Sequence, residues 1–133
     1  MQLTVSSDIA LRALIYLGKK DVPVTISEVA EECGISKSSL MKVVMTLVSA
    51  NLVVSERGRN GGIYLAQDAR DISIGSVVRL MENSLALVEC MKDDPSSCPL
   101  LPGRCRLQPI FYSALDAFFA SLDKSSLADL LKA

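Results

Sequence analysis

Three of the four cysteines in this chain stand close together, at Cys90, Cys98 and Cys105, in a stretch rich in Pro, Gly and Ser. Clustered thiols bind metal ions, hold iron–sulfur clusters or form disulfides. Their C-x7-C-x6-C spacing does not match a compact zinc site, in which paired cysteines lie about two to four residues apart. The thiols could supply three ligands of an iron–sulfur cluster or form a reversible disulfide. Three unrelated thiols are the plain alternative, which their density in this loop disfavours.

The composition limits other kinds of chemistry. Of 133 residues, 14 are Lys or Arg, 15 are Asp or Glu, and none is His. Without histidine there is no Ser-His-Asp or Cys-His nucleophile and no zinc site with a His ligand, and no paired acid–base arrangement indicates an enzyme. The net charge of −1 provides no overall basic field, so nucleic-acid binding requires a local basic patch.

The hydropathy pattern predicts a cytoplasmic protein. No apolar run is long enough to span a bilayer, and the N-terminus lacks the basic and apolar regions of a secretory signal. Structural disulfides are rare in the cytoplasm, where clustered cysteines more often bind metal or sense redox state. The remaining cysteine, Cys33, is expected to be a small buried hydrophobic residue.

A pair of short helices is predicted in the first half of the chain. Thr25-Ile26-Ser27-Glu28 is a capping box that begins the first helix, and Gly34 ends it. Ser36 caps the second helix, whose apolar residues recur with helical periodicity on one buried face. These residues are Leu40, Val43, Val44, Leu47 and Val48. Two helices joined by a short turn with a glycine form a helix-turn-helix.

A basic hairpin is predicted directly after this pair. Residues 52–55 and 63–66 have the composition of two short strands, and the turn between them, residues 56–62, contains three glycines and two arginines. A hairpin in this position is the wing of a winged helix. The first end of the second helix enters the major groove in such proteins, and wing arginines reach phosphates or the minor groove.

The candidate DNA-binding residues are therefore polar or basic and lie on these two elements. They are Ser36, Lys37, Ser38, Ser39 and Lys42 on the second helix, and Arg57, Arg59 and Asn60 on the wing. A solvated helix face with an N-cap is the alternative for the helix residues alone. The attached wing arginines favour DNA contact.

Further helices are predicted on both sides of this unit. Residues 6–17 form a first helix capped by Ser6 or Ser7, and a short helix follows Ile72. Residues 106–122 form a long helix with a continuous apolar stripe, which Phe119 widens beyond the needs of a small domain. The stripe consists of Leu107, Ile110, Phe111, Ala114, Leu115, Phe118 and Leu122. It is either ordinary core or a dimer seam, and a dimer is preferred because two-fold operators are bound by two-fold dimers.

Together these elements predict a mainly α protein built as one compact domain. Residues 1–80 form a winged helix-turn-helix DNA-binding region with a two-stranded wing. Residues 81–105 form a cysteine-rich, cluster-binding loop, and residues 106–133 contain a long C-terminal dimerisation helix.

With these motifs placed, the chain resembles the Rrf-type winged-helix regulators of bacteria, the family of NsrR and IscR, over almost its whole length. The resemblance is carried by Met1–Thr4, Ala10–Arg12, Ile26–Ala30, Gly34–Ser36, Leu40–Val44, the wing Arg57–Gly62 and the three-cysteine loop. It implies a homodimer that binds a pseudo-palindromic operator in double-stranded DNA. It also implies an iron–sulfur cluster, preferably of the four-iron form, with a two-iron form as the alternative.

Within this family the ligand pattern resembles the NsrR type, which senses nitric oxide. IscR-type members carry a histidine just after the last cysteine, whereas Gln108 occupies that region here. The resemblance implies that Cys90, Cys98 and Cys105 are joined by a fourth ligand, Asp8 of the partner subunit. A first-turn acid favoured by the helix dipole is the plain alternative for Asp8.

The expected function is thus a nitric-oxide-sensing transcriptional repressor. The alternatives are a regulator that answers iron or general redox state, a winged-helix regulator switched by a disulfide, and a winged-helix module that binds protein instead of DNA.

Overall fold

The computed structural model describes residues 1–94, 98–100 and 105–132. Its elements, in chain order, are α1 (Val5–Gly18), α2 (Ile26–Cys33), α3 (Lys37–Ser49), β1 (Val53–Glu56), β2 (Gly62–Leu65), the 3₁₀ turn η1 (Ala69–Asp71), α4 (Ile74–Met81), the 3₁₀ turn η2 (Glu89–Met91), α5 (Leu107–Leu122) and α6 (Leu127–Leu131). The strands β1 and β2 form an antiparallel pair, with Val53 opposite Leu65. The predicted mainly helical architecture with a two-stranded hairpin is confirmed.

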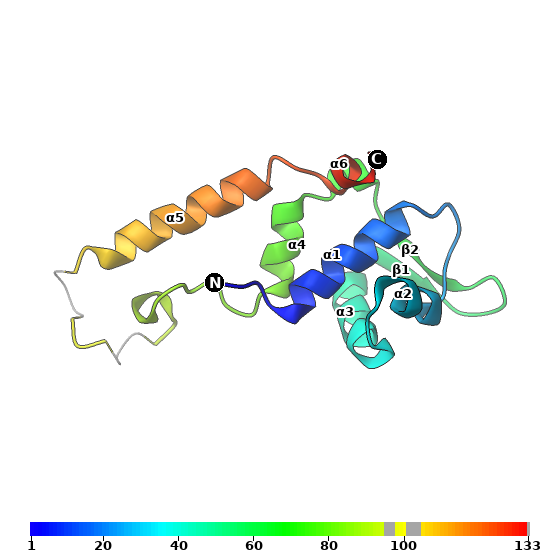
Figure 1. Ribbon diagram of the computed structural model, residues 1–133, viewed down its shortest axis with the longest axis horizontal. Coiled ribbons are helices and arrows are strands. Elements are labelled where there is room, and N and C mark those ends of the chain that lie inside the picture. The colour runs from blue at the N-terminus through cyan, green and yellow to red at the C-terminus, as the bar shows by residue number, and fades with distance from the viewer. Residues whose placement is uncertain (95–97, 101–104, 133) are drawn as a thin grey trace.

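The helices α1 to α4, the hairpin and α6 pack around one hydrophobic core, whereas α5 extends to one side of it (Figure 1). Fully buried side chains from several elements meet in this core, among them Leu14, Leu40, Leu47, Ile63 and Leu127. The last of these lies on α6, so the end of the chain returns to pack against α1. No helix in the described part of the chain is long and apolar enough to cross a membrane.

The predicted helix-turn-helix is present, with α2 and α3 as its two helices. The Thr25 side chain accepts a hydrogen bond from the backbone N–H of Glu28 at 3.0 Å, and Gly34 ends α2 with a φ of 64°. Ser36 caps α3 as predicted. Only the Thr25 half of the capping box forms, because the Glu28 carboxylate accepts a hydrogen bond from the Tyr16 hydroxyl at 2.7 Å.

The beginning of α1 differs from the prediction. Thr4 caps the helix by accepting a hydrogen bond from the backbone N–H of Ser7 at 3.4 Å, so neither Ser6 nor Ser7 is the cap. Ser7 is fully buried, and its hydroxyl donates to the Glu82 carboxylate at 2.7 Å. Several hydroxyl residues in succession could each cap a helix, and the contact with Glu82 decides which of them is drawn into the interior.

The hairpin is joined to the α1–α2 connection by backbone hydrogen bonds. Val24 and Ile63 form an isolated bridge, with N···O distances of 3.1 and 2.8 Å. Gly62 has a φ of 147°, and a Cβ placed on it would lie 2.5 Å from the Val24 carbonyl oxygen. Each strand lies one residue closer to the turn than predicted, because this bridge and the turn hydrogen bond from Gly61 to Gly58 set the register.

The long helix α5 buries one residue. Phe119 is 5% exposed, whereas Leu107 and Ile110 in the predicted stripe are 44% and 63% exposed. The prediction that Phe119 lies beyond the needs of the core is therefore wrong, since it is the residue of α5 that is buried, with Arg79 of α4 over its ring. Val48 at the end of α3 was predicted to be buried and is 38% exposed.

Candidate functional site

The first half of α3 forms a hydroxylated and basic surface opposite the buried side of the helix. Lys37, Ser38 and Lys42 are exposed, and so is the cap residue Ser36, whose hydroxyl donates to that of half-buried Ser39 at 2.8 Å. No acidic residue occurs on α3, so its two lysines have no carboxylate on their own helix. The fold thus presents the predicted helix residues to solvent on one basic surface, as phosphate contact requires.

The wing supplies the second group of predicted DNA-binding residues. Arg57, Arg59 and Asn60 are exposed in the turn of the hairpin, which projects from the body of the molecule in Figure 1. The neighbouring Glu56 accepts a hydrogen bond from the Tyr64 hydroxyl at 2.6 Å, which raises the pKa of Tyr64. Within the described residues neither arginine forms an ion pair, so both guanidinium groups are available to phosphates.

The three predicted cysteine ligands lie between α4 and α5. Cys90 is buried in η2, and the side-chain amide of Gln108 donates to its carbonyl oxygen at 2.5 Å. That hydrogen bond connects η2 to the first turn of α5. Cys98 and Cys105 are half-buried, and all four cysteines of the chain, including half-buried Cys33, are free thiols. Residues 95–97 and 101–104 of this Pro-, Gly- and Ser-rich stretch lie outside the described residues.

The fourth predicted ligand, Asp8, lies in the first turn of α1. Its side chain is 62% exposed and forms an ion pair with Arg12 at 2.6 Å, and Arg12 also donates to the Cys33 carbonyl at 2.8 Å. The described part of this single chain brings no three Cys, Asp or Glu residues together around a metal position. The chemical types of these predicted ligands nevertheless suit an iron–sulfur cluster, because they are free thiols and a carboxylate without histidine.

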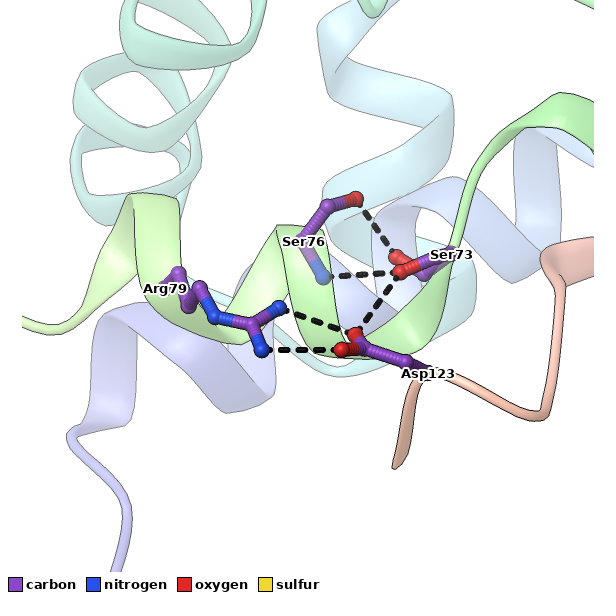
Figure 2. Close-up of polar contacts among 4 residues, drawn as sticks. All are labelled: Ser73, Ser76, Arg79 and Asp123. Carbon is purple, nitrogen blue, oxygen red and sulfur yellow. Dashed lines mark hydrogen bonds and ion pairs between the residues drawn. The ribbon is translucent and has the colours of Figure 1, made fainter. Parts of the chain in front are cut away.

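The far end of α5 is attached to α4 by a bidentate ion pair (Figure 2). Arg79 of α4 donates to both carboxylate oxygens of Asp123 at 2.8 Å, and the Ser73 hydroxyl donates to one of them at 3.3 Å. The Arg79 guanidinium also lies over the Phe119 ring, 4.2 Å from its centroid. The hydrogen bond from Arg79 is the main reason that the pKa of Asp123 is lowered. A side chain at Gly75 would overlap the Asp123 carboxylate, so a glycine is needed for this approach.

Glu82, which follows α4 directly, is attached to the beginning of α1. Its carboxylate accepts hydrogen bonds from the Thr4 backbone N–H at 3.0 Å, from the Thr4 hydroxyl, and from the Ser7 hydroxyl at 2.7 Å. Burial raises the pKa of Glu82, but the hydrogen bonds from Thr4 and Ser7 outweigh burial and the net pKa is lowered. The turn that carries Asp8 is thereby joined to the segment that leads into the cysteine loop. Sequence reasoning missed Glu82, because its partners lie at the opposite end of the winged-helix region.

We expect Glu82→Gln to lower the free energy of unfolding by about 1 kcal/mol at neutral pH, because a charge-assisted acceptor becomes neutral. The folded pKa lies below the ordinary 4.5, so the ionised carboxylate stabilises the fold above the unfolded-state pKa. This contribution is lost as the pH falls through the folded-state pKa. Denaturant unfolding of both proteins between about pH 7 and pH 3 should show the difference shrinking in acid.

The matched control for this experiment is Glu31→Gln on α2, where the carboxylate is exposed. It should change stability little at any pH. A difference between wild type and Glu82→Gln that stays constant with pH would contradict the role given to the ionised carboxylate.

The chain matches the family model described as Rrf2, iron-dependent transcriptional regulator, over residues 3–133. It is 43% identical over 134 residues to a protein of Oceanobacillus iheyensis named HTH-type transcriptional regulator NsrR, with 99% of this chain and 90% of the relative covered. A protein of the same name from Bacillus subtilis is 41% identical over 134 residues, with 99% of this chain and 91% of that relative covered.

Solved structures show the same fold. T. potens IscR superposes with a TM-score of 0.80 at 25% identity, covering 99% of this chain and 87% of that chain. The oxidised form of Staphylococcus aureus CymR superposes with a TM-score of 0.77 at 27% identity, covering 100% of this chain and 98% of that chain.

Proposed function

The chain belongs to the Rrf2 family of transcriptional regulators, and from that premise we propose that it is a homodimeric repressor that senses nitric oxide through an iron–sulfur cluster. It is a DNA-binding transcriptional regulator, and the prediction that it is no enzyme is confirmed by relatives named as transcriptional regulators. The observation that supports the finer proposal is the position of the three free thiols, in the segment that connects the winged-helix body to α5.

The DNA-reading surface consists of α3 and the wing. In the proposed complex, α3 enters the major groove with its first half, where Lys37 and Lys42 neutralise phosphates and the serines contact phosphates or base edges. Arg57 and Arg59 of the wing reach the neighbouring backbone or minor groove. A pseudo-palindromic operator supplies one such half-site to each subunit.

Two features of α5 support a dimer of this chain. Its apolar stripe is largely uncovered, with Ile110 63% and Leu107 44% exposed. An apolar groove of about 510 Å³ also lies between α5, the N-terminal residues and the segment after α4. Its lining includes Leu3, Leu85, Leu87, Phe111, Leu115 and Phe118. A second copy that packs on this surface removes it from water, which is the usual driving force for association.

In the proposed holoprotein, Cys90, Cys98 and Cys105 provide three thiolates, and Asp8 of the other subunit provides a carboxylate. A bound cluster, in the four-iron form that we prefer, would supply iron that reacts with nitric oxide. Asp8 lies on α1, which packs directly against α3, the recognition helix that enters the major groove. A change in the position of this ligand can therefore be transmitted to α3. The ion pair between Arg12 and Asp8 holds the carboxylate on the outer side of α1.

Anaerobic purification followed by a nitric oxide titration tests this proposal. Iron-dependent absorbance in the visible range is expected, together with a loss of affinity for operator DNA as nitric oxide is added. Protein without such absorbance would overturn the proposal. An oxidant-dependent change in DNA affinity without bound iron would favour the disulfide switch, and a response to iron supply alone would favour an iron sensor.

We expect Lys42→Ala to weaken DNA binding by a similar factor on every duplex and to reduce the slope of log affinity against log salt by about 1, since one phosphate contact is lost. Arg57→Ala combined with Arg59→Ala should reduce the slope by about 2. Fluorescence anisotropy with a labelled duplex at several salt concentrations measures both quantities.

Lys19→Ala is the matched control, because Lys19 is an exposed lysine beyond the end of α1. This variant should leave the slope unchanged. If the wing and helix variants also keep the wild-type slope, the protein-binding alternative gains support.

A further inference from the structure

The recognition helix exposes two methionines that were not among the candidate DNA-binding residues. Met41 is 49% exposed and Met45 is 70% exposed. They lie one helical turn apart on the solvent-exposed surface of α3. The two neighbouring methionines give α3 a small exposed apolar surface on the helix that is proposed to enter the major groove, where bound DNA would cover it.

The composition of α3 narrows what this face can recognise. The helix contains no Arg, Asn or Gln, which are the side chains that form bidentate hydrogen bonds with purine edges. Its exposed side chains are instead serines, lysines, the two methionines and, near the end of the helix, Val48. In the major groove, the C5 methyl group of thymine is the apolar feature by which a base pair is recognised.

We propose that Met41 and Met45 determine operator specificity by packing against thymine methyl groups in the major groove. This inference rests on the proposed binding of α3 to DNA. Lys37 and Lys42 flank the methionines and give the face the positive charge that a DNA duplex attracts and a hydrophobic protein partner does not require. Methionine is also suited to the task, because its flexible thioether chain adapts to an irregular apolar surface.

The spacing of the two methionines matches DNA geometry. Four residues of α-helix advance about 6 Å along the axis, which is close to two base-pair steps of about 3.4 Å each. Half-sites should therefore contain thymines roughly two steps apart beneath α3, on one strand or the other.

The test begins with selection of binding sites. The full-length protein, purified anaerobically, enriches duplexes from a random-sequence pool, and the enriched duplex is resynthesised with uracil at one thymine position at a time. Uracil lacks the methyl group but keeps the hydrogen-bonding edge. At one or two positions in each half-site, uracil should weaken wild-type binding about fourfold, the factor expected for one buried methyl or methylene group.

The variants assign the effect to the two side chains. Met41→Ala should abolish the uracil effect at one position and Met45→Ala at the other, while Met41→Leu should retain it because the apolar contact persists. Lys42→Ala should weaken binding to both duplexes equally and preserve their ratio. Leu130→Ala is the matched control, because Leu130 is 42% exposed on α6, on the opposite side of the body from α3 in Figure 1.

Two results would overturn the proposal. One is an enriched duplex whose affinity does not depend on any thymine methyl group. The other is a uracil effect of equal size in wild type and in the Met41→Ala, Met45→Ala double variant. Either result leaves the proposed DNA-binding function standing, because duplexes were selected. If wild type enriches no duplex, the proposed function fails together with this inference, and a protein occupant of the methionine face is favoured.

Discussion

Cys105→Ser should yield protein that is purified without iron and whose affinity for DNA no longer changes with nitric oxide. The proposed site has three thiolates and one carboxylate, so no spare thiol remains in the loop to replace a lost ligand. Serine is a poor substitute because its hydroxyl stays protonated near neutral pH, whereas iron–sulfur clusters are held by thiolates. The measurements are iron per chain, visible absorbance, and DNA affinity with and without nitric oxide.

Cys105 is preferred to Cys90 for this experiment because of burial. Cys105 is half-buried, whereas Cys90 is buried at the contact with Gln108, where a substitution also disturbs packing. Cys105→Ser is therefore also expected to keep the fold and the oligomeric state of the wild-type protein, as circular dichroism and gel filtration would show.

Cys33→Ser is the matched control. Cys33 is half-buried at the end of α2, with its Sγ 3.9 Å from the Arg12 carbonyl oxygen, and burial raises the pKa of its thiol. A thiol with a raised pKa is a weak ligand, so this variant should keep its iron and its response. If Cys33→Ser loses iron while Cys105→Ser retains it, the proposed ligand set is wrong. The wild-type protein could also prove to contain no iron. If Cys105→Ser then still abolishes the response of DNA binding to nitric oxide, a thiol switch is the better description.

Gly62→Ala should lower the free energy of unfolding by about 3 kcal/mol or more, the largest effect on stability expected in the wing. Two costs combine at this position. The φ of 147° is strained for any residue with a side chain, and the new Cβ would lie 2.5 Å from the Val24 carbonyl oxygen. That oxygen accepts a hydrogen bond from the backbone N–H of Ile63, so relief of the contact separates the hairpin from the core.

Gly58→Ala separates the two costs. Gly58 has a φ of 107°, but a Cβ placed there meets nothing within 4 Å. Backbone strain alone should cost about 1–2 kcal/mol. Denaturant unfolding of the three proteins at one fixed chain concentration measures the differences, since the stability of the proposed dimer would depend on concentration. Equal losses of unfolding free energy in the two variants would show that the close approach of residue 62 to Val24 adds nothing to the cost of a side chain there.

The helix-turn-helix is an example of a structure that local sequence signals predict. Thr25, Gly34 and Ser36 end or begin their helices by contacts within a few residues, so their types alone predicted the turn correctly. The proposed cysteine ligands were likewise selected from residue types and density, and their role stays a prediction. The arrangement of these ligands in space could not be predicted from the sequence. It depends on residues from both ends of the chain and, in the proposal, on a second subunit.

The contacts that sequence reasoning missed join residues far apart in the chain. Glu82 binds Thr4 and Ser7, and Arg79 binds Asp123, across separations of 75 to 78 and 44 residues. An exposed ion pair and a half-buried carboxylate have no periodicity that would reveal their partners. The same limitation explains why Phe119 was misplaced, since the helical periodicity of α5 does not show which of its apolar residues will be buried.

The amino-acid sequence by itself therefore determined the helix-turn-helix, the basic wing and the supply of three thiols without histidine, because caps, turns and ligand types act over a few residues. Only the tertiary structure decided which face of α5 is buried, how α5 is attached through Arg79 and Asp123, and how Glu82 joins the first turn of α1 to the end of α4. The physical reason is that packing and long-range hydrogen bonds select among surfaces that local patterns make equivalent. The same selection left Met41 and Met45 in solvent on α3.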